Sequence, residues 1–225
     1  MSDTFDLSPY YAEQRALAAR VTRTDELPDP VRFVGGCDVA YFEKQDRMIG
    51  AVTVLDARTL EVVESAYHDT EITFPYIPGL FSFREIPTLV AAYRALVLKP
   101  DLPICDGHGV AHPQGLGMAS HLGLILNTPT VGCAKSRLVG EWDREGLDER
   151  KGATVPLLHG GREIGRILRS RHAVRPLFVS TGHRVSLDTA VRWVLRATPS
   201  YRLPETTRSA DQLVNRLRKS ALEKQ

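Results

Sequence analysis

Three stretches in the first third of the chain alternate in part between apolar and polar positions. They cover residues 31–42, 48–55 and 60–72, and they are rich in Val, Ile, Thr and Tyr. β-branched and aromatic residues in this pattern are typical of strands, and the short polar segments between them favour hairpins. The pattern therefore predicts three consecutive antiparallel strands.

The remainder of the chain alternates helical spacing with short apolar runs. Residues 84–99 have apolar residues at helical spacing, and Pro87 fits if that helix begins near Glu85 or Ile86. The segments 101–106 and 128–136 are nearly all apolar, as expected for strands buried on both faces. We also expect helices over 8–22 (with Ser8 as N-cap), 118–126 and 186–198 (with Ser186 as N-cap), a strand beginning near 176, and at most one hairpin within the charged segment 140–175.

These elements predict an α/β fold. Three antiparallel strands followed by alternating helices and strands give a mixed sheet, with helices on both faces. Residues 1–225 show no internal repeat and no linker, so we expect one domain, with a final helix over 209–225 that frays.

Composition narrows the class of protein. The 225 residues carry a net charge of only +2, so any contact with nucleic acid must come from a local basic face. Three cysteines lie far apart without a CxxC pair, which favours buried thiols in a reducing compartment over a disulfide framework or a zinc site. The polar, acidic start and the absence of long apolar runs predict a cytoplasmic protein with no membrane segment. We expect a monomer.

One segment, FPYIPGLFSFRE at 74–85, fits neither periodicity. It holds four aromatic residues around Pro75 and Pro78, which disfavour both helix and strand. The segment predicts a stiff apolar loop that leads directly into Glu85. Phe74, Phe81 and Phe83 are expected to be mainly core anchors, and Tyr76 to be exposed.

Carboxylates and a histidine stand at predicted element ends. Asp38 lies in an apolar strand, Asp106 follows a buried one, Glu85 begins a helix, and His183 follows another buried strand. Each alone is more often a cap or an ion-pair partner than a functional group. Two aspartates on neighbouring strands would repel each other without a cation, and oxygen ligands suit Mg²⁺ or Mn²⁺ better than zinc.

Several motifs together resemble the endonuclease V family. They are GGCDVAYF, FPYIPGLFSFRE, PDLPICDGHGVAHPQGLGMASHLGL, PTVGCAKSRL, PLFVSTGHRVS and YRLPETTR, in this order across residues 10 to 208. The resemblance implies a ribonuclease-H-like fold, similar to the C-terminal nuclease domain of the excision-repair incision protein. It implies recognition of deoxyinosine in DNA and hydrolysis of the second phosphodiester bond 3′ to the lesion, with Mg²⁺ or Mn²⁺. The expected ends are a 3′-hydroxyl and a 5′-phosphate.

The same resemblance implies roles for individual residues. The metal-binding carboxylates are expected to be Asp38, Glu85 and Asp106, with His183 as a fourth member of the site. Lys135 is expected to contact a phosphate, and His112 to support the metal site or the lesion pocket. Tyr76, stiffened by Pro75 and Pro78, is expected to enter the duplex at the lesion. Separately from the resemblance, we assign the pocket for the flipped base to Gly79, Gly107 and Gly109, where backbone can approach closely, together with Leu80.

This chemistry suits these residue types. Attack of water on a phosphodiester anion needs positive charge, which two Mg²⁺ ions about 4 Å apart can supply. An enzyme that inspects a base must extrude it, and aromatic wedges fill such gaps. Hypoxanthine presents an O6 acceptor where adenine has an amino donor, so backbone N–H groups beside glycines could distinguish the two.

The sequence also fits other interpretations. The substrate could be inosine-containing RNA, the protein could bind lesions without cleaving, or it could be a phosphatase acting on small nucleotides. The arginines at 162, 166, 169, 171 and 175, and the basic Arg216, Arg218 and Lys219, could follow phosphates or simply face solvent.

Overall fold

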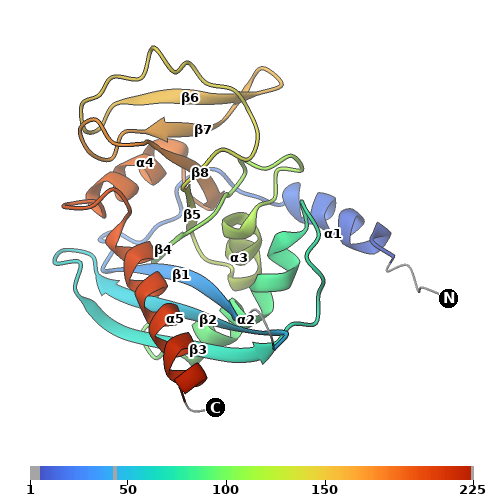
Figure 1. Ribbon diagram of the computed structural model, residues 1–225. Helices are drawn as coiled ribbons and strands as arrows, with labels where there is room; N and C mark the ends of the chain where they lie inside the picture. The colour runs from blue at the N-terminus through green and yellow to red at the C-terminus, as the bar shows by residue number, and fades with distance from the viewer. Residues whose placement is uncertain (1–5, 43–44, 224–225) are drawn as a thin grey trace.

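The computed structural model describes residues 6–42 and 45–223, and its centre is one eight-stranded sheet (Figure 1). The first five residues, residues 43–44 in the first predicted separator and the last two of the predicted final helix lie outside the described part. In chain order the strands are β1 (Phe33–Phe42), β2 (Arg47–Asp56), β3 (Val62–Glu71), β4 (Leu102–Cys105), β5 (Thr130–Ala134), β6 (Thr154–His159), β7 (Arg162–Leu168) and β8 (Leu177–His183). Their order across the sheet is β3-β2-β1-β4-β5-β8-β7-β6.

The sheet is mixed, as the sequence predicts. β1, β2 and β3 form an antiparallel meander, whereas β4 and β5 run parallel to β1. β8 runs antiparallel to β5, and the predicted hairpin within 140–175 is β6–β7, which pairs with β8 and extends the same sheet. The direction of β8 decides where its carboxyl end lies.

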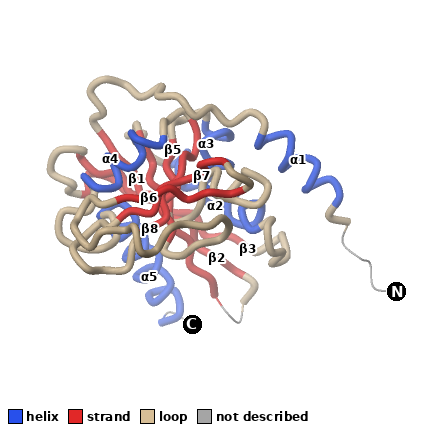
Figure 2. Tube along the Cα trace, turned by 90° about the horizontal axis from the view of Figure 1, so that it is seen from above, coloured by secondary structure: helices blue, strands red, loops and turns tan. Residues whose placement is uncertain are grey.

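Helices cover both faces. The five helices are α1 (Ser8–Ala18), α2 (Phe81–Ala95), α3 (Met118–Leu126), α4 (Leu187–Arg196) and α5 (Glu205–Glu223). Odd positions such as Cys37 and Cys105 pack with α2 and α3, while even positions such as Val34 and Ile104 pack towards α4. α1 lies at the rim of the sheet rather than over it (Figure 2).

The final helix crosses directly over β1 and β2 (Figure 1). Leu213 and Val214 of α5 pack against Ala40, Phe42 and neighbouring residues of these strands. The approach is close at the start of the helix, where a Cβ on Gly36 would lie 1.8 Å from the Thr206 carbonyl oxygen. Glycine at this strand position therefore allows α5 to reach the sheet, and the helix continues to Glu223.

Three local predictions are settled at helix ends. Ser186 caps α4 as predicted, by accepting the N–H of Thr189. Ser8 is not a cap, because it is already helical and its own N–H donates to Asp6 Oδ1 (2.9 Å). α2 begins at Phe81 rather than near Glu85, so Pro87 lies inside the helix.

No helix among the described residues is long and apolar enough to cross a membrane. Cys37, Cys105 and Cys133 are buried free thiols.

Candidate active site

Two aspartates come together because their strands are in register. Cys37 of β1 pairs with Cys105 of β4 in the parallel ladder, so the next residues, Asp38 and Asp106, are neighbours at the same edge. Parallel strands bring their carboxyl ends to one edge of a sheet, where sites in α/β proteins form. The predicted proximity of Asp38 and Asp106 is thus a consequence of the strand pairing.

Glu85 reaches the same edge from the helical layer. It lies on the second turn of α2, is 6% exposed, and its Oε1 accepts a hydrogen bond from the Tyr41 hydroxyl (2.9 Å). Tyr41 comes from β1, three positions after Asp38, and the Arg84 guanidinium lies 5.1 Å from the centre of its ring. The strand that carries the first aspartate therefore also orients the glutamate.

Two of the carboxyl groups, Asp38 and Glu85, have raised pKa values. Burial, together with the charge of Asp106, raises the pKa of Asp38 to about 7. Burial also raises the pKa of Glu85 to about 8, with contributions from Asp38 and Asp106 and against the hydrogen bond from Tyr41. A cation placed between these carboxyl groups would stabilise their ionised forms, so the arrangement favours cation binding.

Lys135 supplies one positive charge at this edge. It follows β5, and its ammonium forms an ion pair with Asp106. Burial alone would lower the pKa of Lys135, but the hydrogen bond and charge of Asp106 outweigh it and raise the pKa. Arg202 donates to the carbonyl oxygen of Lys135 (3.0 Å) and to that of Pro176 (3.0 Å), and so fixes the backbone that carries the lysine.

Asp211 is an additional acidic residue that the sequence analysis missed. It lies on α5, and its charge raises the pKa of Asp38 and of Lys135. The available signal was its place two residues before Leu213 and Val214, the buried pair of an amphipathic helix. Which strand that helix covers could not be deduced from spacing.

The donor set fits a hard divalent cation. Among the described residues, no three histidine, cysteine or carboxylate side chains are arranged as a preformed metal cluster. Even so, burial and the neighbouring carboxylates raise the pKa of Asp38 to about 7 and that of Glu85 to about 8, so a cation bound beside them would favour their ionised forms. Carboxylate oxygens with room for water are the ligands that Mg²⁺ and Mn²⁺ prefer.

A cavity of about 540 Å³ opens beside Asp106. The walls include the predicted Tyr76, Pro78, Gly79, Gly107 and His112, together with Asp106 and Lys135. Phe81, Met118 and Leu138 add apolar surface. A volume of this size with apolar walls and a few polar groups is typical of a small-ligand site.

The aromatic loop presents Tyr76 to solvent and anchors Phe74 and Phe83. Tyr76 is 66% exposed, and its ring lies edge-on to Phe81 at 5.8 Å between centroids. Phe74 and Phe83 instead pack edge-on against Tyr10 of α1, at 4.8 and 5.5 Å. Phe81 differs from the expected core anchor, because it is 38% exposed and lines the cavity.

Three residues expected at the lesion-binding site do not line this cavity. Leu80 is fully buried, and Pro75 is exposed on the loop outside the cavity. Gly109 packs against β8, where a Cβ would lie 1.9 Å from the Thr181 carbonyl oxygen. His112 does line the cavity, and burial lowers its pKa to about 4, so it is neutral at pH 7.

His183 is not brought to the carboxylates. It pairs with Thr130, the first residue of β5, whereas Asp106 and Lys135 follow the far ends of β4 and β5. The imidazole is buried, and its Nδ1 accepts the N–H of Thr22 (3.2 Å). Because β8 runs antiparallel to β5, His183 lies at the edge away from Asp106 and Lys135. There it binds the connector between α1 and β1, residues 19–32.

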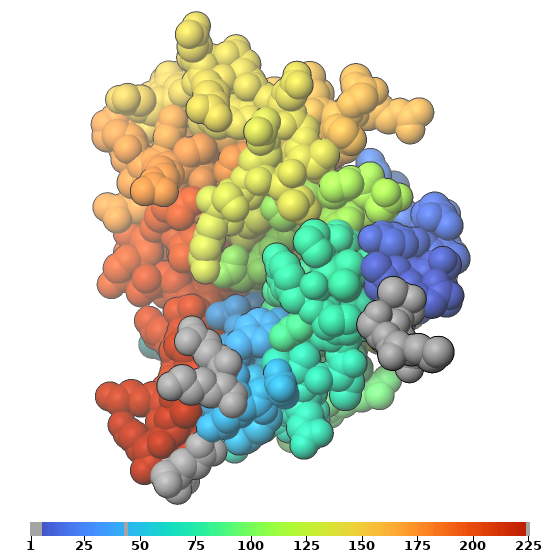
Figure 3. Space-filling model, turned by 45° about the vertical axis from the view of Figure 1, so that its right-hand side comes forward, coloured from blue at the N-terminus to red at the C-terminus, as the bar shows by residue number. Residues whose placement is uncertain are grey.

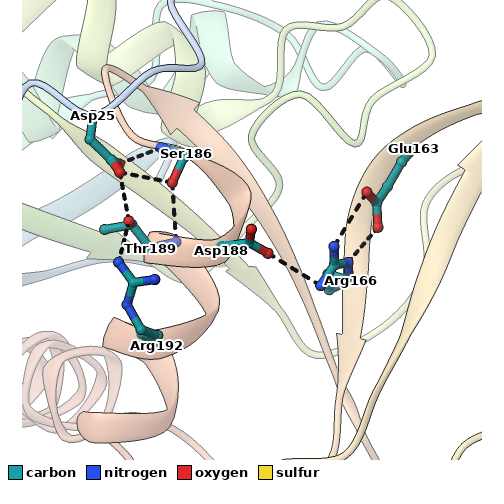
Figure 4. Close-up of polar contacts among 7 residues, drawn as sticks. All are labelled: Asp25, Glu163, Arg166, Ser186, Asp188, Thr189 and Arg192. Atoms are coloured by element: carbon teal, nitrogen blue, oxygen red, sulfur yellow. Dashed lines mark hydrogen bonds and ion pairs between the residues drawn. The ribbon is translucent and has the colours of Figure 1, made fainter.

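The basic segment is partly used inside the fold. Arg166 pairs with Glu163 and with Asp188 of α4 (3.4 Å), as Figure 4 shows. Arg169 donates to the carbonyl oxygens of Asp148 and Val174. Two of the five arginines thus have structural partners.

Figure 4 also shows the Asp25 carboxylate, which accepts hydrogen bonds from Ser186 and Thr189. These bonds join the connector of residues 19–32 to α4.

Comparisons with known proteins agree over almost the whole chain. The family model described as Endonuclease V matches residues 15–212. The endonuclease V of Nostoc punctiforme is 47% identical over 202 residues, which is 90% of each chain. The crystal structure of endonuclease V from Streptomyces avermitilis superposes with a TM-score of 0.92 at 45% identity, covering 98% of this chain and 96% of that one.

A more distant structure contains nucleic acid. A variant of the Ciona intestinalis endonuclease V, in complex with DNA containing an inosine followed by a ribo-adenosine, has a TM-score of 0.84 at 25% identity and covers 96% of this chain and 98% of its own. The mixed sheet and its neighbours confirm the ribonuclease-H-like α/β fold. With the family model spanning most of its length and relatives at nearly half identity, the chain belongs to the endonuclease V family.

Proposed function

We propose that the protein is a DNA-repair endonuclease that recognises deoxyinosine and hydrolyses the second phosphodiester bond 3′ to it, leaving a 3′-hydroxyl and a 5′-phosphate. The observation that carries the proposal is the adjacency of two features. A cavity with room for a base, with Tyr76 at its rim, adjoins Asp106 and Lys135. Family membership gives the nuclease activity, and the Ciona complex shows that a relative binds inosine-containing DNA.

The carboxylates would hold the cofactor. Asp38, Glu85 and Asp106, with Asp211 at α5, would bind Mg²⁺, or Mn²⁺ in its place. Such a cation, when bound, supplies Lewis-acid stabilisation of charge at the scissile phosphate. Strands β1 and β4 fix the two aspartates, and Tyr41 fixes Glu85, so little reorganisation accompanies binding.

Other side chains bind and orient the nucleic acid. Lys135 would place its ammonium against a non-bridging phosphate oxygen, a fixed positive charge where negative charge develops. Tyr76 would fill the gap left by the extruded base, with its backbone stiffened by Pro75 and Pro78. Gly79 and Gly107 would let backbone approach the base, whose O6 accepts where adenine donates.

An end-labelled duplex with one deoxyinosine tests this proposal. The wild-type protein with Mg²⁺ should nick it at the second bond 3′ to the lesion, leave an adenine duplex intact, and lose activity in EDTA. Asp106→Asn should bind the inosine duplex normally and cleave it at least about 100-fold more slowly, because a metal ligand is lost. Asp188→Asn removes an exposed carboxylate outside the cavity and should behave as wild type. Unchanged nicking by Asp106→Asn in excess Mg²⁺ would remove Asp106 from the mechanism.

Inosine-containing RNA is the second candidate substrate. The Ciona protein was crystallised with a strand in which a ribonucleotide follows the inosine. Duplexes with inosine in an all-ribose strand, and with one ribonucleotide 3′ to the deoxyinosine, belong in the same assay. Faster cleavage of the ribose strands would assign the activity to RNA. The buried thiols fit either role in a reducing compartment such as the cytoplasm.

A further inference from the structure

The helix at the rim of the sheet reaches residues of the cavity wall through one buried side chain. α1 is mostly exposed, yet Gln14 is fully buried. Tyr10, one turn earlier on the same face, packs on Phe74 and Phe83 at either end of the aromatic loop. Figure 3 shows α1 in blue beside the teal surface, which is the colour of the aromatic loop and its neighbours in the chain.

Gln14 joins two segments of the cavity wall. Its side-chain amide donates to the carbonyl oxygen of Gly79 at 2.7 Å and, at 3.5 Å, to that of Leu116. Gly79 lies three residues after Tyr76, while Leu116 belongs to a separate segment of the wall, with His112 and Gly117. One amide has two N–H donors, so it can hold both carbonyls at once.

Stability alone does not explain a glutamine here. The Gln14 Oε1 atom is buried without a hydrogen-bond partner among the described residues, and a buried unpaired acceptor is unfavourable. The Gly79 turn has a φ of +85° and no atom within 4 Å of the position of a Cβ, so packing does not fix it on that side. The hydrogen bond from Gln14 supplies the restraint that packing leaves out.

We propose that Gln14 is a positioning residue for lesion recognition. It fixes the Pro78–Gly79 turn, and with it Tyr76, at a set distance from the Leu116 wall, and this sets how strongly the cavity prefers inosine over adenine. The inference rests on the proposed function. Gln14 is not among the residues that line the cavity and it makes no contact with the carboxylates, so hydrolysis of a bound strand does not depend on it.

The test separates recognition from cleavage. Dissociation constants for inosine and adenine duplexes are measured in EDTA, and single-turnover cleavage at saturating protein is measured with Mg²⁺. Gln14→Leu keeps the bulk and removes both donors, so the preference for the inosine duplex should fall about tenfold. The saturating cleavage rate should change less than about threefold. Glu13→Leu, at an exposed position of the same helix, should leave both unchanged.

Amide hydrogen exchange gives a readout independent of activity. Residues 76–80 should exchange faster in Gln14→Leu, while strands β1 and β4 stay unchanged. Gln14→Asn, which shortens the side chain by one methylene, gives the same test should the leucine variant not fold. If the wild type prefers the inosine duplex and both Gln14 variants prefer it just as strongly, the proposed role of Gln14 is overturned. A wild-type protein without preference for inosine would overturn the proposed function and this inference together.

Discussion

The Tyr41 hydroxyl carries a testable role at the scale of one residue. It donates to Glu85 Oε1 at 2.9 Å, and this bond opposes the rise of the Glu85 pKa that burial causes. In Tyr41→Phe the glutamate loses its donor, so it should be protonated to higher pH and bind Mg²⁺ about tenfold more weakly. The midpoint of a Mg²⁺ titration, by cleavage and by calorimetry, should rise accordingly.

Tyr67→Phe is the matched control for this change. Tyr67 is 54% exposed on β3, so removing its hydroxyl should leave the Mg²⁺ midpoint unchanged. Equal midpoints for Tyr41→Phe and wild type would show that the hydrogen bond does not orient the ligand.

Single residues also show what the sequence could and could not predict. Asp38 and Asp106 were candidates from the sequence because a carboxylate is unusual within one apolar strand and at the end of another, and their proximity follows from the pairing of β1 with β4. The exposure of Tyr76 between two prolines was predictable as well. Asp211 and Gln14 were not, because both lie on helices and helical periodicity does not say what a helix covers.

Strand direction decides the place of His183 at the scale of elements. His183 and Asp106 both stand at the carboxyl end of buried strands, but β8 is antiparallel to β5, so the two reach opposite edges. Apolar runs look alike in either direction, so sequence alone gave no basis for separating them. The start of α2 was also not predictable. The helix begins at Phe81, within the aromatic loop, and continues through Pro87.

We therefore expect His183→Ala to weaken the fold rather than the metal site. Burial, with the charge of Arg184, lowers the pKa of His183, so its neutral Nδ1 can accept the Thr22 N–H at pH 7. The alanine leaves that N–H unpaired and should reduce the free energy of unfolding by about 1–3 kcal/mol. Urea unfolding measures the loss, with exposed His159→Ala as control. A higher Mg²⁺ midpoint with unchanged stability would instead return His183 to the site.

The whole molecule should respond to pH through its clustered carboxylates. Without metal, folded Asp38 and Glu85 keep their protons up to about pH 7 and 8, whereas unfolded carboxyls lose theirs near pH 4. Between these values the folded state binds more protons, so its stability falls as pH rises. Buried His108, His112 and His121 have pKa values lowered to about 4 and act in the opposite sense, mainly below pH 6.5.

Comparing wild type with Asp38→Asn isolates the carboxylates, since both proteins share the histidines. From pH 6 to pH 8 the metal-free wild type should lose about 1 kcal/mol more than the variant, which is about 2–4 °C in Tm for a chain of this size. Mg²⁺ should restore Tm in the wild type, more at pH 8 than at pH 6, because ionised carboxylates bind it. The variant should respond weakly at both values. An equal change in Tm between pH 6 and pH 8 for the two proteins would mean that Asp38 ionises freely. The cluster would then not hold the charge that a divalent cation would neutralise.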